Sequence, residues 1–556
     1  MSASVGYNIM ANNKTVALLL QCCFAETERS GPVVALKTGT VRGRYVAVKG
    51  AEQVEVYLGV PYARPPLGQL RFTAPQPAEP WEGVRGATEL PKRCLQETEP
   101  MGNEWETFPI NYPTVEMSED CLYLNVYRPA GTASGDKLPV MVWIHGGALA
   151  TGAASEYDGS ALAAYHNVVV VIIQYRLNIL GFLSTGDKHA PGNWGFLDQI
   201  ACLHWVHDNI AALHGDPNSV TIFGTAGISV SLLTLSPLAE GLFHRAIPMS
   251  GVVPLEAEFT SDPLTLAQMM ASASDCESDD NEELVQCMRG RTEEEMLSAI
   301  KKFQALVAPA VDGVFLTSPL EEVLKSQKFQ KVPVLLGATN HEFGWMLPWY
   351  VGPPGWDKGM TREDVLSVLE ISYPFHAPGA NEAILNEYLQ EDDSPESIRD
   401  AFTEIFGDLI LVLPILKVSA HHRDAGVPVY FYEFQHSPQM FRGTRPSFVK
   451  ADHYDDISFF LGYPFLTGDI SIKDPVPQEE EELSRIMMAY IANFACNGSP
   501  NGPGLVEWPR YDHNESYLKL NLQQTVGQRL KQNRAHFMDV VLPAELGNSH
   551  PASDEL

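Results

Sequence analysis

Three short segments of the chain carry residue types that acyl-transfer chemistry uses. The sequence HGGA at residues 145–148 follows an apolar run, Glu342 follows a second apolar run, and His453 lies further along the chain. Such chemistry combines a nucleophile, a histidine that takes its proton, an acid that orients the histidine, and backbone N–H groups that hold the developing oxyanion. The segments offer candidates for every part except the nucleophile, which a serine on a sharp strand-to-helix turn would supply.

These segments must be positioned by the strands that precede them. Apolar runs predict strands at 138–144, 168–175, 220–223, 332–336 and 427–434. An amphipathic helix is predicted from Leu197 to Leu213, followed by a turn at 215–218, and a second helix begins near Ser229, after Gly224 breaks the strand. This alternation predicts an α/β fold with a mostly parallel central sheet and helices on both faces, whose ligands bind at the carboxyl ends of the strands.

Several motifs, in a fixed order, resemble one family. The sequence EDCLYLNVY at 119–127 resembles the signature of the carboxylesterase/cholinesterase family, and the motifs at 62–68, 174–177, 192–195 and 450–453 are similar to family motifs as well. The resemblance covers essentially residues 32–556 and is greatest to the liver and intestinal carboxylesterases. It implies an α/β-hydrolase fold with inserted helical subregions. It also implies hydrolysis of small-molecule esters, amides or thioesters through an acyl-enzyme, with no cofactor and no metal.

The resemblance assigns roles to the candidate residues. It implies that Glu342 is the triad acid and that His453 is the general base, in the chain order expected for this fold. Gly146, Gly147 and Ala148 would form the oxyanion loop. Ala148 replaces the third glycine of the HGGG motif, so its N–H remains, but its Cβ would clash if the backbone needs a glycine-only conformation.

The match fails at the nucleophile elbow. After the strand at 220–223 the family reads GESAGG. This chain reads GTAGIS at 224–229, so two residues of the family's elbow are missing. Ala226 therefore stands at the nucleophile position, and alanine has no atom that can attack a carbonyl. Ser229 is an alternative nucleophile only if the strand extends by three residues, which moves the turn by roughly 10 Å. Thr225 is placed worse, because its branched Cβ suits a strained elbow poorly.

Two further residues near the predicted site differ from the family pattern. Pro248 stands in the predicted strand beside the elbow strand, where it removes a backbone donor from the ladder. Tyr454 follows His453 where the family has glycine. Together with the shortened elbow, these changes predict a site that is no longer held to esterase geometry.

The ends of the chain and its charge indicate a compartment. The apolar run at 15–24, followed by Ala25, predicts a signal peptide over residues 1–25, which leaves a single α/β-hydrolase domain over 26–552. The last four residues, SDEL at 553–556, resemble the endoplasmic-reticulum retention signal and imply its receptor as a partner. A net charge of −31 argues against a nucleic-acid or anionic-membrane partner. We therefore expect a protein of the endoplasmic-reticulum lumen without a transmembrane anchor.

The cysteines fit an oxidising compartment. Cys94 and Cys121 bracket one loop, and Cys276 and Cys287 bracket a shorter acidic one. Both pairs are predicted to form disulfides, which the family resemblance supports.

Two cysteines are left over in apolar helical patterns. Cys202 and Cys496 are predicted to be buried free thiols, and no Cys/His spacing suggests a zinc site. Asn514 begins an N-glycosylation acceptor sequence, and Asn497 begins a second one that Pro500 weakens.

Two functions fit these features. The first is a carboxylesterase with ester, amide or thioester substrates. The second is a catalytically inactive lumenal binding or interaction protein on the same fold. Because Ala226 stands at the nucleophile position, the sequence favours impaired or absent catalysis.

Overall fold

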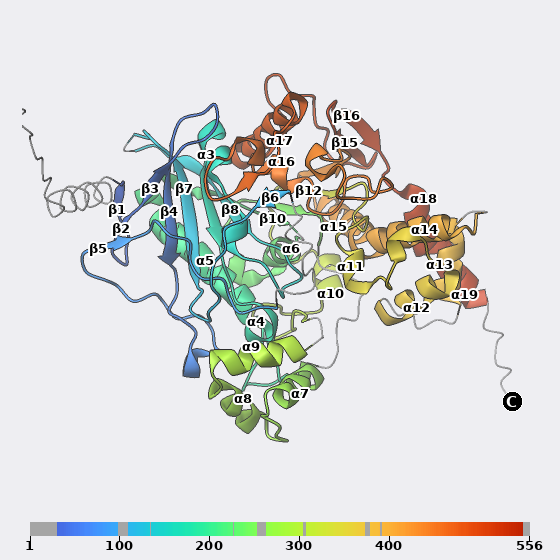
Figure 1. Cartoon of the computed structure of the whole chain (residues 1–556), viewed down its shortest axis with the longest axis horizontal. Helices are drawn as coiled ribbons and strands as arrows, with labels where there is room; N and C mark the ends of the chain where they lie inside the picture. Colours follow the sequence, from blue (N-terminus) through green and yellow to red (C-terminus); the bar gives the residue numbers. More distant parts are fainter. Residues whose placement is uncertain are drawn as a thin grey trace, which may run out of the picture.

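A large mixed sheet forms the centre of the molecule (Figure 1). The computed structural model describes residues 31–97, 109–133, 135–225, 227–252, 263–303, 307–372, 379–389 and 392–548. In these residues the sheet has 11 strands in the order β16-β15-β13-β12-β11-β10-β8-β9-β7-β4-β3. Their bounds are β3 Arg44–Val46, β4 Val54–Pro61, β7 Tyr123–Pro129, β8 Leu138–Ile144, β9 Val169–Ile173, β10 Gly215–Thr225, β11 Arg245–Met249, β12 Val334–Thr339, β13 Val429–Phe434, β15 Ser516–Leu520 and β16 Thr525–Gln528.

The middle of this sheet is parallel. The neighbouring pairs from β15 through β13, β12, β11, β10 and β8 to β9 are parallel, whereas the pairs involving β16, β7, β4 and β3 are antiparallel. Two small sheets are formed by β1 (Val33–Ala35), β2 (Thr40–Arg42) and β5 (Val84–Gly86), and by β6 (Ile110–Asn111) and β14 (Ser471–Ile472).

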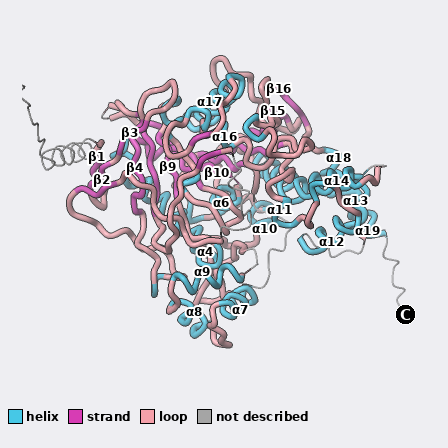
Figure 2. Tube along the Cα trace, viewed as in Figure 1, coloured by secondary structure: helices cyan, strands magenta, loops and turns pink. Residues whose placement is uncertain are grey.

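Helices cover both faces of the sheet, because successive side chains of a strand point to opposite faces. In β8, Val140 and Val142 belong to one apolar cluster, which includes residues of α5 (Trp194–Asn209), and Met141 and Trp143 belong to another, which includes residues of α17 (Gln478–Asn497). Figure 2 shows the strands running through the middle of the molecule with helices around them. The predicted fold class, α/β-hydrolase, is confirmed.

Two groups of helices are added to this core (Figure 1). One consists of α7 (Pro263–Ala273), α8 (Asn281–Arg289) and α9 (Glu293–Lys302). The other consists of α12 (Arg362–Ser372), α13 (Ala380–Leu389), α14 (Pro395–Gly407) and α19 (Leu542–Asn548). This second group has its own apolar cluster, to which Phe343 also contributes, directly after Glu342.

Most predicted elements are present with small shifts at their ends. The strand at 138–144 is found as predicted, and the helix predicted from Leu197 to Leu213 is α5 continued by a 3₁₀ turn at Ile210–Leu213. The predicted turn at 215–218 is an irregular start of β10, where the Asn218 N–H donates to Asp216 Oδ1 and the register with β8 shifts. The predicted break at Gly224 is wrong, because β10 continues to Thr225. A Cβ at Gly224 would lie 2.0 Å from the Ile144 oxygen, so the glycine allows β8 to approach closely rather than ending the strand.

Pro248 lies inside the central sheet, as predicted. It belongs to β11, between β10 and β12, where it is the register partner of Gly224. Proline has no N–H to give to the ladder, so the sheet is weakened beside the elbow strand.

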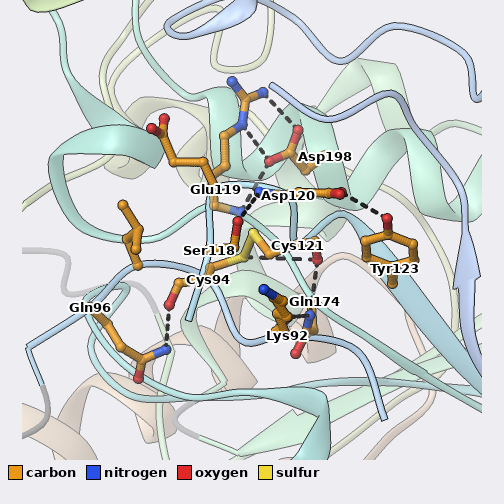
Figure 3. Close-up of a disulfide and its surroundings, with 12 residues drawn as sticks. Lys92, Cys94, Gln96, Ser118, Glu119, Asp120, Cys121, Tyr123, Gln174 and Asp198 are labelled. Carbon is orange, nitrogen blue, oxygen red and sulfur yellow. Dashed lines mark hydrogen bonds and ion pairs between the residues drawn. A yellow bond between two sulfur atoms is a disulfide. The ribbon is translucent and has the colours of Figure 1, made fainter. Parts of the chain in front are cut away.

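Both predicted disulfides are present, Cys94–Cys121 and Cys276–Cys287. Figure 3 shows the first of them with Gln174 nearby, whose side-chain amide donates to the Cys121 carbonyl at 2.9 Å.

One cysteine prediction is wrong. Cys202 is a buried free thiol, but Cys496 is exposed. The last turn of α17 buries Phe494 and Ala495 and turns the next residue outward. Among the described helices, none is long and apolar enough to cross a lipid bilayer.

Candidate active site

Glu342 and His453 lie side by side, although 111 residues separate them in the chain. His453 Nδ1 lies 2.6 Å from Glu342 Oε2, and both side chains are buried. Glu342 follows β12, and its Oε1 accepts a hydrogen bond of 2.6 Å from the backbone N–H of Thr339. A bridge between His341 and Asp452 joins the two loops that carry the pair. Because Nδ1 faces the carboxylate, Nε2 is the nitrogen left to take a proton.

Glu342 favours the protonated form of His453. Burial lowers the pKa of His453, but the charge and hydrogen bond of Glu342, together with the charges of Asp452 and Asp456, raise it by more, so the pKa lies above its ordinary value. An imidazole held in this way is a stronger base than one in water.

Buried aspartates beside this pair fix the turn that follows Glu342. Asp452 accepts hydrogen bonds from the backbone N–H groups of residues 344–346, at 2.9–3.1 Å. Arg445 Nη1 lies 2.7 Å from Asp455 Oδ2. Burial raises the pKa of Asp452 to about 6, against the opposing effect of Arg445. The acidic run DHYDD at 452–456 was the only signal for this cluster in the sequence, which does not reveal that its carboxylates are buried.

Asp456 is another buried carboxylate near His453. Its Oδ2 accepts a hydrogen bond of 2.6 Å from the Tyr432 hydroxyl, and its Oδ1 has no hydrogen-bond partner among the described residues. Burial raises the pKa of Asp456 to about 7; Tyr432 and His453 lower it, and Glu342 and Asp455 raise it further. Near neutral pH this carboxylate therefore gains or loses a proton.

The variant Asp456→Asn should flatten the fall in stability between pH 5 and pH 8. Folded Asp456 has a pKa of about 7, against an ordinary value of 3.8, so the folded chain binds the extra proton between these values. The free energy of unfolding therefore falls as pH rises through this window, and asparagine removes that contribution. Urea midpoints of native and variant chains across the window measure the difference.

The control is Asp208→Asn. Lys37 lowers the pKa of exposed Asp208 through a hydrogen bond, so this variant should alter the pH dependence only in acid, below the ordinary pKa of the group. Equal slopes in the native and Asp456→Asn chains between pH 5 and pH 8 would contradict the assignment.

The HGGA loop holds left-handed backbone at Gly147, Ala148 and Leu149, with φ of +104°, +52° and +61°. A Cβ at Gly147 would lie 2.3 Å from the Thr151 oxygen, so this position needs glycine. Ala148 also occupies a region that disfavours a side chain. In the described part of the chain, no acceptor is bonded to the backbone N–H groups of residues 146–149. These groups are therefore available to an oxyanion.

The elbow is described at its flanks, because Ala226 lies outside the described residues. Thr225 ends β10 as the register partner of Met249, and the Gly227 N–H donates to the Met249 oxygen at 3.0 Å. A Cβ at Gly227 would lie 2.4 Å from the Gly251 oxygen. The chain therefore passes closely over the end of β11 as it enters α6 (Ile228–Leu235).

Ser229 lies in the first turn of α6 and is 6% exposed. Its Oγ accepts a hydrogen bond of 2.9 Å from Gln199 Nε2 and also lies beside the Tyr175 hydroxyl. No hydrogen bond joins it to His453 within the described residues. The structure thus brings Glu342 and His453 together and leaves Ser229 in a different set of hydrogen bonds.

Comparisons with known proteins agree on one family. The model of the carboxylesterase family matches residues 30–538. The protein "Fatty acyl-CoA hydrolase precursor, medium chain" of Anas platyrhynchos is 46% identical over 521 residues, which cover 91% of each chain. Cocaine esterase of Homo sapiens is 46% identical over 525 residues, or 93% of each chain. Carboxylesterase 5A of Canis lupus familiaris is 46% identical over 520 residues, or 92% of this chain and 89% of that one.

Proposed function

Because the chain belongs to the carboxylesterase family, we propose that it is a carboxylesterase-type protein with impaired catalysis. The observation that carries the proposal is the sequence GTAGIS at 224–229, which puts Ala226 where the attacking serine belongs. Glu342 and His453 remain paired at 2.6 Å, so the base has kept its orienting acid but has no hydroxyl to activate.

The expected size of the loss in turnover supports the proposal of impaired catalysis. Removing the serine from a triad hydrolase lowers turnover by on the order of 10⁶-fold and leaves about 10³–10⁴-fold over water, from the oxyanion donors and from substrate binding. The N–H groups of residues 146–149, which have no bonded acceptor among the described residues, would supply such a residual effect. Esters, amides or thioesters with an apolar acyl part are the ligands we propose, in line with the relatives named for fatty acyl-CoA and cocaine ester hydrolysis.

The second candidate is a binding protein on the same fold. It is favoured by the combination of a missing nucleophile with unbonded N–H groups in the oxyanion loop, since such a site can hold a carbonyl without turning it over. We also propose that residues 1–25 are a signal peptide, that 26–552 form one domain, and that the chain resides in the endoplasmic-reticulum lumen. The exposed side chain of Asn514 fits glycosylation there.

Fluorophosphonate labelling tests the proposal, because the probe reacts only with an activated nucleophile. The comparison uses the native chain and an elbow-restored chain, in which Glu-Ser-Ala-Gly-Gly replaces residues 225–227. We expect no label on the native chain and a label on the introduced serine of the restored chain, located by peptide mapping.

Labelling of the native chain at Ser229 or Thr225 would overturn the proposal, because either residue would then be a displaced nucleophile. A restored chain that also carries His453→Ala is the matched control, since it keeps the serine and removes its base.

A further inference from the structure

Tyr454 adopts an unusual backbone conformation directly after His453. Its φ is +74°, in the left-handed region that disfavours a residue with a Cβ. Its carbonyl accepts a hydrogen bond of 3.2 Å from the Ile457 N–H, in the turn that leads into α16 (Ile457–Phe460). Such a conformation persists only where the surroundings hold it, and it is concentrated at functional sites.

The ring of Tyr454 covers one side of His453. The two ring centroids lie 4.7 Å apart at an interplanar angle of 82°, an edge-to-face contact. Among the described residues, none forms a hydrogen bond with His453 Nε2, the nitrogen that would take the proton of a nucleophile. The side chain of Tyr454 is therefore the neighbour that a reagent must pass on this side of the imidazole.

Groups from several parts of the fold act electrostatically on the hydroxyl of Tyr454. Burial raises its pKa well above the ordinary value, Glu156, Tyr350 and Tyr175 raise it further, and the Thr225 hydroxyl lowers it. These groups come from separate parts of the fold: the end of β10, the segment after β9, a 3₁₀ turn at Ala154–Glu156, and α11 (Pro348–Val351).

Thr225 relates Tyr454 to the elbow strand. It is the last residue of β10, and the nucleophile position is the next one along the chain. Thr225 Oγ1 is buried and forms no hydrogen bond of standard geometry with a described residue. Thr225 is thus the residue of the elbow strand whose hydroxyl acts on the Tyr454 hydroxyl.

We propose that the ring of Tyr454 shields the imidazole of His453 and thereby decides what can reach it. The inference builds on the proposed function and deepens it: the site has a second obstacle to ester hydrolysis, independent of the missing serine. Only ligands that displace the ring or fit beside it reach Nε2. Glycine is the residue that this backbone prefers, so Tyr454→Gly removes the ring without backbone strain.

Modification of His453 by diethylpyrocarbonate measures access directly, since this reagent acylates neutral imidazole and requires no serine. We expect Tyr454→Gly to raise the modification rate of His453 by about tenfold or more, because the rate scales with the fraction of molecules in which the site is open. Peptide mapping separates this histidine from the others. His207, whose side chain is 57% exposed, serves as the internal standard and should react at one rate in all chains.

Two further variants keep the test falsifiable. Tyr454→Phe keeps the ring and should leave the rate as in the native chain. Tyr454→Asn is small, tolerates left-handed backbone, and should react like Tyr454→Gly. Equal rates of His453 modification in the native, glycine and asparagine chains would overturn the proposal.

Fluorophosphonate distinguishes this failure from failure of the proposed function. Tyr454→Gly with the native elbow should remain unlabelled, because opening the site creates no nucleophile. A label on that chain would contradict the proposed function, but it would not contradict the proposed role of Tyr454 in limiting access to His453. The elbow-restored chain should label more slowly than the same chain with Tyr454→Gly, and equal rates would count against Tyr454.

Discussion

Ester hydrolysis should rise by on the order of 10⁶-fold when the elbow is restored in the Tyr454→Gly chain, because that factor is the usual cost of a missing triad serine. The restored serine would meet a base that the structure already holds, with His453 Nδ1 at 2.6 Å from Glu342 Oε2. Turnover of p-nitrophenyl acetate at saturating concentration, compared with Tyr454→Gly alone, measures the gain.

The gain should depend on His453. Adding His453→Ala to the restored, opened chain should remove nearly all of it, because serine and histidine act as one unit and removing either costs about as much as removing both. A rise of less than about tenfold on restoration would mean that the remaining parts are displaced from working geometry, since even a triad lacking its orienting acid keeps roughly 70-fold over one lacking its serine.

Loss of a buried charge should produce the largest change in stability. Asp198→Asn is expected to lower the free energy of unfolding by about 3–5 kcal/mol, because it leaves the charge of Arg176 buried without its partner. Arg176 Nε and Nη2 donate to the Asp198 carboxylate at 2.8 and 2.7 Å, and the side chains are 5% and 0% exposed. The pair joins α5 to the segment that follows β9, and urea denaturation measures its loss.

Two controls separate burial from charge. Asp208→Asn breaks the exposed pair with Lys37, whose side chains are 49% and 62% exposed, and should cost less than about 1 kcal/mol. The double variant Arg176→Met with Asp198→Leu should be less destabilised than Asp198→Asn, because it leaves no buried charge unpaired. If Asp198→Asn costs no more than Asp208→Asn, the buried pair does not hold this part of the fold.

The two obstacles at the site act at different steps of the reaction. In the function that we propose, the missing serine removes the covalent step, whereas Tyr454 limits the approach of a ligand to His453. A chain with both obstacles should hydrolyse esters more slowly than a chain with either one. A small ligand held by the N–H groups of residues 146–149 would then remain bound and would not be hydrolysed. The same features therefore suit the binding role that is the second candidate function.

The fold class could be read from the sequence, and so could the residue type at the proposed nucleophile position. An alanine lacks an attacking atom in every conformation, so Ala226 needed no coordinates. The fold class followed from local periodicity: β8 was placed at 138–144 because a parallel strand buried on both faces is continuously apolar. Errors arose where a local signal was overruled by packing, as at Gly224, which stays in β10 because β8 approaches it closely.

The tertiary structure alone decided what lies around His453. Glu342 meets the imidazole of His453 across 111 residues of chain, through the contact between two loops, and no local pattern encodes that distance. Whether a carboxylate is buried, and so whether its pKa shifts, depends on which elements pack over it. The sequence by itself thus determined which atoms are present for chemistry, and only the fold decided which of them face one another, because side-chain proximity is a product of long-range packing.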